Sequence, residues 1–269
     1  MSVTPFQSAI LLQLARQRRE RGESYVAGGL ALNALLSTPR RSRDIDLFHD
    51  TETALAATWT ADRVLLEANG YEVRTLREAM SFVEAVVAKE GERTIMQWAR
   101  DSAFRFFPLV EDESMGLTLH PFDLATNKVL AMAGRLEVRD WVDALYCDES
   151  LQPLGCLLWA ACGKDPGYNP HSLLAAARRL HYSQAEVDTL DFASEQPDAA
   201  RLGERWHEAL DDSGRIIACL PPEHVGKCVI TREAHLFRGN AVKLAHVMAA
   251  GGILFHEGRI GGAWPRVTG

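Results

Sequence analysis

Two aspartates and two glycines near the N-terminus have the types and spacing of a site that handles phosphate. Asp44 and Asp46 stand two residues apart in the stretch Asp-Ile-Asp-Leu-Phe, and Gly28-Gly29 precedes an apolar run typical of a helix. On an extended strand, alternate side chains share a face, with Cα atoms about 6.6 Å apart. Two carboxylates so placed repel each other unless a cation neutralises them, and their oxygens suit Mg²⁺. The pair therefore predicts a metal site, although a solvated strand is the common setting of an isolated Asp-x-Asp.

The elements around these residues indicate how they are positioned. A short strand over residues 23–27 leads through Gly28 and Gly29 into a helix over residues 30–36, and residues 44–49 form the next strand. The first N–H groups of a helix lack partners within it and attract phosphate, and glycine lets a ligand approach the backbone. We therefore predict a nucleoside triphosphate at the two glycines and a Mg²⁺ ion on the two aspartates. A tight strand-to-helix turn is the alternative for the glycines alone.

A second segment adds specificity to this pattern. It reads Asp123-Leu124-Ala125-Thr126-Asn127-Lys128, then Gly134-Arg135, then Arg139-Asp140-Trp141-Val142-Asp143. Together the two segments resemble the polymerase-β-type nucleotidyltransferases, in particular their AbiEii-type branch, the toxin component of some bacterial toxin–antitoxin systems. The resemblance spans residues 20–180. It implies that Lys128 approaches the nucleotide phosphates and that Asp140 or Asp143 supports it. It also implies an RNA end as acceptor, with tRNA the best-known class, and a separately encoded antitoxin.

The residues of the downstream segment also favour two helices on their own. Lys128 falls in the middle of a helix predicted over residues 123–133. Asp140 and Asp143 lie three residues apart, and so on one face, of a second helix over residues 137–146. The alternative is an exposed pair between Arg139 and Asp143, which would contribute only about 0.3–0.5 kcal/mol.

One position departs from the pattern of the family that the chain resembles. Such enzymes usually carry a third carboxylate on a later strand, and the hairpin predicted here, with its turn at Glu90-Gly91, offers Gln97 instead. An amide oxygen can bind a hard cation but brings no charge. Glu84 and Asp101 are candidate substitutes, although acids of this kind are ordinarily just exposed. The number of metal ions and the retention of catalysis depend on this strand.

Basic residues are predicted to read the phosphates. Arg40, Arg41 and Arg43 directly precede Asp44 and are expected to face the triphosphate or an RNA acceptor. The arginines that close the first helix, at positions 16, 18, 19 and 21, are expected to be solvated. The formal net charge of −7 opposes binding to a polynucleotide, which depends on phosphate neutralisation. A small-molecule nucleotidyltransferase of the antibiotic-modifying type, and a nucleotide- or RNA-binding module without catalysis, are therefore kept as alternatives.

The whole chain predicts an α/β (α+β) protein with two lobes. Its 269 residues, 47% hydrophobic, can build a nucleotidyltransferase domain with a small mixed sheet over 1–120 and a helical domain over 121–215. The active cleft is expected between them. Residues 216–269 form an extension of uncertain fold, with a hairpin over 253–264. A further helix is predicted over residues 183–192.

The remaining features set the cellular context. Five cysteines without Cys-x-x-Cys spacing argue against a disulfide framework and a zinc site, so we expect buried thiols. Apolar stretches fall short of a membrane span, and the first residues do not resemble a secretory leader. We therefore predict a cytoplasmic protein that has no membrane partner.

Overall fold

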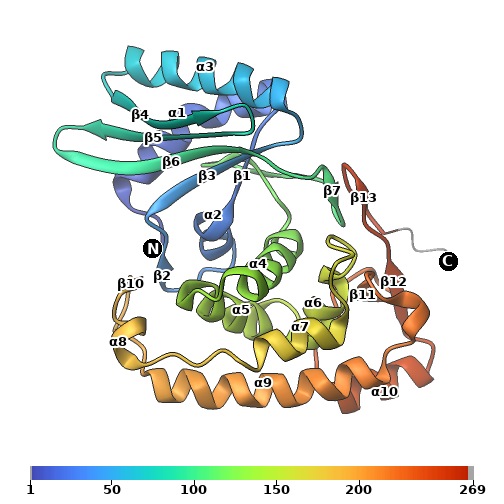
Figure 1. The fold of residues 1–269 in the computed structure, drawn as a ribbon. Helices are drawn as coiled ribbons and strands as arrows, with labels where there is room; N and C mark the ends of the chain where they lie inside the picture. The colour runs from blue at the N-terminus through green and yellow to red at the C-terminus, as the bar shows by residue number, and fades with distance from the viewer. Residues whose placement is uncertain (1, 266–269) are drawn as a thin grey trace. The chain divides into compact units, whose positions relative to one another are not determined.

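A mixed sheet and a set of helices make up the α+β fold of the chain, seen here in a computed structural model that describes residues 2–265 (Figure 1). The chain forms two compact units. The first contains residues 1–103 and 108–120, and the second contains residues 104–107 and 121–269. Residues 216–265 therefore belong to the same unit as the helices that precede them.

The first unit is built on a seven-stranded sheet. In sheet order its strands are β4 (Glu72–Ala79), β5 (Phe82–Lys89), β6 (Glu92–Arg100), β3 (Asp44–His49), β1 (Tyr25–Ala27), β9 (Gly116–Thr118) and β8 (Val110–Asp112). The pairs β3–β6 and β1–β9 are parallel, and the other neighbours are antiparallel. The turn between β5 and β6 is Glu90-Gly91, as predicted, and both residues have positive φ, as the tight hairpin turn requires.

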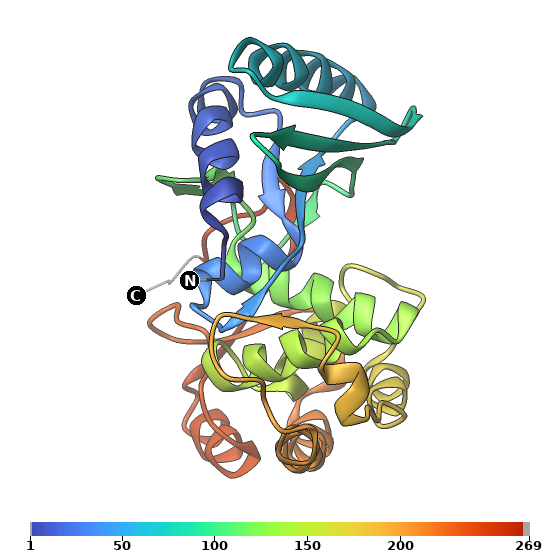
Figure 2. The same ribbon diagram turned by 90° about the vertical axis from the view of Figure 1, so that its left-hand side faces the viewer.

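Three helices cover this sheet: α1 (Pro5–Arg21), α2 (Gly28–Leu35) and α3 (Glu52–Ala68). Figures 1 and 2 show α1 and α3 on one face and α2 on the other. The start of α1 is specified locally, because the hydroxyl of Thr4 accepts from the N–H of Gln7 and the Gln7 amide oxygen accepts in return. A short strand, β2 (Arg40–Arg41), lies between α2 and β3.

The strand β3 alternates between a buried face and a half-buried face, as its sequence predicts. Ile45 and Leu47 are completely buried. Leu47 pairs with Trp98 of β6, whose ring contacts Trp59 of α3 at 4.7 Å between centroids. Because side chains alternate along a strand, Asp44 and Asp46 lie on the opposite face, which is the face that carries α2 (Figure 1).

The second unit is mainly helical. Its helices are α4 (Pro121–Arg135), α5 (Val138–Ser150), α6 (Leu154–Ala161), α7 (Pro170–Ala177), α8 (Gln184–Val187), α9 (Ala199–Cys219) and α10 (Ala241–Ala249). Its strands are β7 (Phe104–Arg105), β10 (Asp191–Phe192), β11 (Cys228–Thr231), β12 (Ile253–His256) and β13 (Arg259–Ile260). The buried helix α6 packs against α9, and Trp206 of α9 contacts Trp141 of α5. These contacts place the apolar core between the helices.

Two predicted elements are wrong. The helix predicted over 183–192 ends after one turn of α8, where the side chain of Gln196 donates to the carbonyl oxygen of Val187, and residues 191–192 are extended. The hairpin predicted over 253–264 does not form, because β12 pairs with β11 and β13 pairs with β7. Both pairings join segments far apart in sequence, which local patterns do not reveal.

Two expectations about cysteines and membrane segments can also be compared with the structure. Four of the five cysteines are buried, as predicted, but Cys219 at the end of α9 is exposed. Within residues 2–265, none of the helices combines the length and the apolar character needed to cross a bilayer.

Candidate functional site

The junction of β1 and α2 brings Gly28 against Asp46. Gly28 has a φ of +66°, in the left-handed region that favours glycine. A Cβ atom added to Gly28 would lie 1.8 Å from the Oδ2 atom of Asp46. The contact follows from the sheet, because Ala27 of β1 is paired with Asp46 of β3. Both the backbone conformation and the neighbouring carboxylate therefore require glycine at this position.

The next glycine contacts an arginine. A Cβ atom added to Gly29 would lie 2.5 Å from the Nη2 atom of Arg40 and 3.3 Å from the hydroxyl of Ser42. Arg40 is buried, and its Nη1 atom donates to the carbonyl oxygen of Arg41 at 3.0 Å. The beginning of α2 is thus flanked by a carboxylate at one glycine and a guanidinium at the next.

The three predicted arginines differ in their surroundings. Arg40 lies at the glycines, whereas Arg41 is half-buried in β2. Arg43 is exposed, and its carbonyl oxygen accepts a hydrogen bond from the hydroxyl of Thr94 at 2.9 Å. Of the three, the structure therefore brings Arg40 to the helix start.

Polar residues continue from Asp46 across the neighbouring strands. Asp46 is in register with Gln97 of β6, and Gln97 is in register with Glu84 of β5. The Nε2 atom of Gln97 donates to Glu84 at 2.9 Å. Asp101 is four residues beyond Gln97, about 13 Å farther along the strand, and its carboxylate accepts from the N–H of Ser102. Glu84, and not Asp101, belongs to the row that contains Asp46.

This donor set suits one kind of metal site. Among residues 2–265, no three His, Cys, Asp or Glu side chains are grouped so that they could hold an ion. Asp44 and Asp46 share a face, and the amide of Gln97 follows in the row. Mg²⁺ is commonly bound by one or two carboxylates together with water and substrate phosphates. The two aspartates therefore fit a Mg²⁺ ion that is held jointly with a nucleotide.

In the second unit, Lys128 of α4 is paired with two acids of α5. Its Nζ atom lies 2.9 Å from Asp140 and 3.2 Å from Asp143. Arg135 also donates to Asp140, through Nε at 2.6 Å and through Nη2 at 3.0 Å. The Lys128 side chain is only 7% exposed, and both acids are fully buried. The segment identified in the sequence thus forms one compact ionic cluster.

The charges within this cluster balance. Two cations meet two acids, so the formal charge of the four side chains is zero. Burial alone would raise the pKa of Asp140, but hydrogen bonds from Arg135 and the charge of Lys128 hold that pKa below its usual value. Asp143 is not an exposed partner of Arg139, as the alternative supposed, because it is buried against Lys128. The guanidinium of Arg139 lies 2.5 Å from Glu137.

A second buried ion pair in this unit was not predicted. The carboxylate of Asp123 accepts from the backbone N–H groups of Phe106 and Phe107, at 2.9 and 3.0 Å. Lys164 lies 2.9 Å from the same carboxylate and also donates to Asn127 at 2.7 Å. Lys164, which lies in the loop after α6, therefore has a structural role. Its sequence signal, an isolated lysine before a Pro-Gly turn, does not reveal the distant partner.

The first unit also contains a buried polar cluster that the sequence did not indicate. Arg18, expected to be solvated, is buried, and its guanidinium donates to the carbonyl oxygen of Met115. Burial lowers the pKa of Arg18 to about 10, opposed by the charge of Asp62. Burial raises the pKa of Asp62 to about 6, and its carboxylate accepts from the indole of Trp98. Burial likewise lowers the pKa of His49 to about 4.

The fold and this geometry define the class of protein. It is an α+β protein whose sheet presents two aspartates beside the glycine-rich start of a helix. No family model matches the chain, and none of the curated proteins does.

Solved structures similar to the chain include proteins named as nucleotidyltransferases. One, from Helicobacter pylori, is 17% identical over 79% of this chain and 93% of its own, with a TM-score of 0.49. JHP933 from Helicobacter pylori is 16% identical over 78% and 89%, with a TM-score of 0.49. MenT4, a nucleotidyltransferase toxin from Mycobacterium tuberculosis H37Rv, is 16% identical over 81% and 87%, with the same TM-score of 0.49. At these values the similarity alone does not assign a family or an activity to the chain.

Proposed function

We propose that the chain is a nucleotidyltransferase that moves a nucleoside monophosphate from a nucleoside triphosphate to an acceptor hydroxyl, with Mg²⁺ as cofactor. The observation that carries this proposal is the contact between Asp46 and Gly28 at the start of α2. Asp44 shares the face of Asp46, and the guanidinium of Arg40 lies at Gly29. Carboxylates, unpaired helix N–H groups and a guanidinium are the groups that bind a metal-complexed polyphosphate.

Each of the site residues in the first unit has a role in this proposal. The backbone at Gly28 and Gly29 holds the phosphates, and Arg40, Arg41 and Arg43 offset their charge. Asp44 and Asp46 hold the Mg²⁺ ion, which when bound draws charge from the phosphate oxygens.

The chemical step forms one bond and breaks another. The acceptor oxygen bonds to the α-phosphorus, the bond from that phosphorus to the bridging oxygen breaks, and pyrophosphate leaves. The proton of the acceptor hydroxyl passes to Asp46, or to a carboxylate beside it. An in-line displacement of this kind needs the nucleophile and its base on the same side of the sheet as the phosphates.

Lys128 is proposed to neutralise charge on the leaving group. An ammonium has three N–H donors, and two of them can serve Asp140 and Asp143 at the observed distances. The two acids and Arg135 hold the lysine in one orientation, which limits its search among rotamers.

The acceptor is proposed to be an RNA end, with tRNA as the leading candidate, and the chain an AbiEii-like toxin of the cytoplasm restrained by an antitoxin. This part comes from the sequence resemblance. MenT4, one of the similar structures, is named as a nucleotidyltransferase toxin.

The experiment incubates the purified chain with α-labelled nucleoside triphosphates, Mg²⁺ and total RNA. We expect label in RNA, and a loss of at least about 100-fold in Asp44→Asn and in Asp46→Asn. Asp101→Asn is the matched control, because it makes the same change beyond the end of β6, and it should keep the activity. Equal rates in all three variants would overturn the proposal.

The same experiment separates the alternatives. The acidic net charge favours a small cationic acceptor, and transfer to such an acceptor should change little with salt, whereas RNA binding weakens steeply as salt rises. Gln97, in place of a third carboxylate, favours a module without catalysis. Nucleotide binding with no incorporation of label under any divalent metal would support that second alternative.

A further inference from the structure

Within residues 2–265, no third acid is paired across the sheet with the two aspartates of the candidate site. On β6, Gln97 is in register with Asp46, and Ile95 is in register with Asp44. On β1, the residue paired with Asp46 is Ala27. Paired residues on neighbouring strands share a face of the sheet, so a carboxylate at any of these three positions would join the two aspartates. The three positions carry an amide and two apolar side chains instead.

The next acid in this row of the sheet is Glu84, and its carboxylate is engaged by Gln97. Glu84 is in register with Gln97 on β5, two strands from Asp46, which separates the Cα atoms of Glu84 and Asp46 by about 9.6 Å. The Nε2 atom of Gln97 donates to the Oε1 atom of Glu84 at 2.9 Å. Because β5 and β3 lie on opposite sides of β6, this bond holds the Gln97 amide between the two acids. The group next to Asp46 on this side is therefore uncharged.

The charges around the aspartates also oppose a second cation. Arg40 is buried at Gly29, next to the glycine that contacts Asp46. In two-metal sites the ions lie about 3.5–4 Å apart, so their mutual repulsion has to be offset by the surrounding carboxylates. Among the residues that the structure describes, no three acidic, histidine or cysteine side chains are grouped to do so. The donor set therefore fits one ion and does not fit two.

We propose that the candidate site binds a single Mg²⁺ ion together with the nucleotide, and that Gln97, held in place by Glu84, keeps a second ion out. This inference rests on the proposed function, because the ion is shared with the nucleotide. The acceptor hydroxyl then has no ion of its own, and its proton passes directly to a carboxylate. Glu84 is a positioning residue in this arrangement, since it acts through Gln97.

The test counts the metal ions bound by the full chain in equilibrium dialysis. Mn²⁺, which prefers the same oxygen ligands as Mg²⁺, is combined in turn with labelled α,β-methylene analogues of ATP, GTP, CTP and UTP, which cannot transfer their nucleoside monophosphate. We expect one Mn²⁺ ion per bound nucleotide. Two ions per bound nucleotide would overturn this inference and leave the proposed function standing. Failure to bind any of these nucleotides together with metal would overturn the proposed function, and this inference with it.

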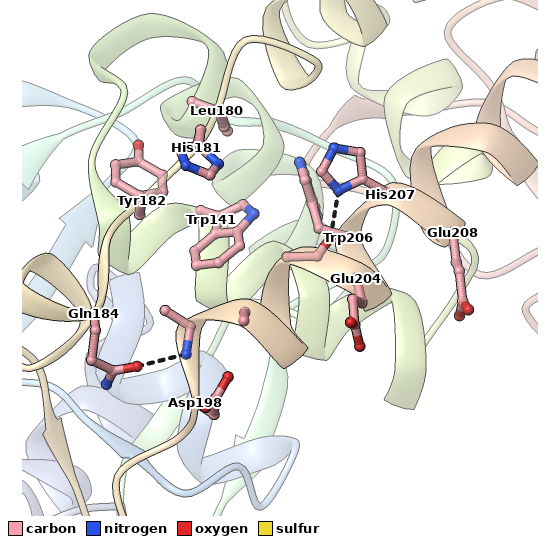
Figure 3. A pocket seen from close by; sticks show the side chains of 13 residues that line it. Trp141, Leu180, His181, Tyr182, Gln184, Asp198, Glu204, Trp206, His207 and Glu208 are labelled. Carbon is pink, nitrogen blue, oxygen red and sulfur yellow. Dashed lines mark hydrogen bonds between the residues drawn. The ribbon is translucent and has the colours of Figure 1, made fainter.

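Acids elsewhere in the chain are counted separately. Asp198, Glu204 and Glu208 line a pocket of about 1000 Å³ in the second unit, and Figure 3 shows their carboxylates spread along it and not converging on one point. An ion attracted to these acids would bind without the nucleotide. Dialysis with Mn²⁺ alone therefore measures this background, which is subtracted from the count.

An exchange of the two side chains tests the role of Gln97. The double variant Glu84→Gln, Gln97→Glu has the composition and net charge of the native chain, and an amide still faces a carboxylate across β5 and β6. Its carboxylate now lies next to Asp46, so we expect two Mn²⁺ ions per bound nucleotide. Urea unfolding shows whether this variant is folded.

Glu84→Gln alone is the matched control. The new amide oxygen still accepts from Gln97, so the count should stay at one and the affinity for Mn²⁺ should change by less than about twofold. A loss of about tenfold or more in that affinity would show that Glu84 binds the metal itself. One ion per nucleotide in the folded double variant would show that Gln97 does not set the count. Either result would overturn the proposal.

Discussion

At the scale of single residues, the candidate site depends on a contact that a side chain would destroy. Gly28 combines a left-handed backbone with the carboxylate of Asp46 directly against its Cα atom. Gly22, at the end of α1, has the same φ of +66°, but a Cβ atom there would meet nothing within 4 Å. Substitutions at these two glycines can therefore distinguish two costs. Both variants bear the cost of the left-handed backbone, but only a side chain at position 28 must also displace Asp46.

The first prediction concerns Gly28→Ala. The added methyl group must displace the Asp46 carboxylate, so nucleotidyl transfer should fall at least about 100-fold. Left-handed alanine should also lower the free energy of unfolding by about 1–2 kcal/mol. Gly22→Ala should lose only this backbone contribution, measured by urea unfolding, and should retain activity, whereas Gly28→Ala also bears the cost of displacing Asp46. Equal activity of the two variants would show that Asp46 need not lie where it does.

A second prediction at this scale concerns His49, which is buried in the first unit. Its pKa is lowered to about 4, whereas an unfolded histidine titrates near 6.5. Between these values the unfolded chain binds the extra proton, so the contribution of neutral His49 to stability is lost as pH falls through this window. Asp62 acts in the opposite sense, because its pKa is raised to about 6, so that native Asp62 takes up its proton at a higher pH than the unfolded chain does.

Replacing His49 by glutamine removes one of these two titrations. The stability of the native chain relative to His49→Gln should decrease by about 2 kcal/mol between pH 7 and pH 4.5. Urea unfolding at the two pH values measures this difference. If native and variant stabilities change in parallel, His49 does not titrate with the lowered pKa.

At the scale of elements, α4 and α5 are joined by ion pairs that are buried away from water. Lys128 meets Asp140 and Asp143 where all three side chains are buried, so each charge depends on the others. In contrast, Arg63 and Glu67 of α3 form an ion pair that is about half exposed on each side, at 46% and 45%. Buried charges that lose a partner are costly, while exposed pairs contribute little.

The third prediction follows from this comparison. Lys128→Met should lower the free energy of unfolding by about 3–5 kcal/mol, because two carboxylates lose their cation. Adding Asp143→Asn should recover part of that loss, since one uncompensated charge is then removed. Arg63→Met is the control and should change stability little. Additive losses in the double variant, measured by urea unfolding, would contradict the coupling.

At the scale of the whole molecule, the chain passes between its two units more than once. Residues 104–107 belong to the second unit, although the residues on both sides belong to the first. This segment is held by Asp123, by the pairing of β7 with β13, and by a hydrogen bond at 2.8 Å between His256 and the carbonyl oxygen of Phe106. Asp123 of α4 therefore helps to hold residues 104–107 in the second unit.

The fourth prediction tests that role. Asp123→Asn removes the negative charge opposite Lys164 and one acceptor for the Phe106 and Phe107 amides, so stability should fall by about 2–4 kcal/mol. Hydrogen exchange at these two amides should become faster. Asp165→Asn is a suitable control, because the Asp165 carboxylate accepts from the N–H of Gly167 within a local turn. Unchanged exchange in Asp123→Asn would mean that other contacts hold the segment.

Much of the fold could be predicted because it is encoded by local patterns. The strand at residues 44–49 and the turn at Glu90-Gly91 lie where alternation and turn chemistry place them. The 253–264 hairpin was wrong because each of its strands pairs with a partner elsewhere in the chain. The pairing of Gln97 with Glu84 also depends on strand register.

The sequence by itself determined that Asp44 and Asp46 share a face, because alternation along a strand is a property of the backbone. It also determined that Lys128 and the Asp140–Asp143 pair lie on helices, because helical periodicity is local. Only the tertiary structure decided that Asp46 lies against Gly28, that Lys128 is buried between two acids, and that Asp123 holds a distant segment. These contacts depend on strand order, register and helix packing, which bring together residues that no local pattern connects.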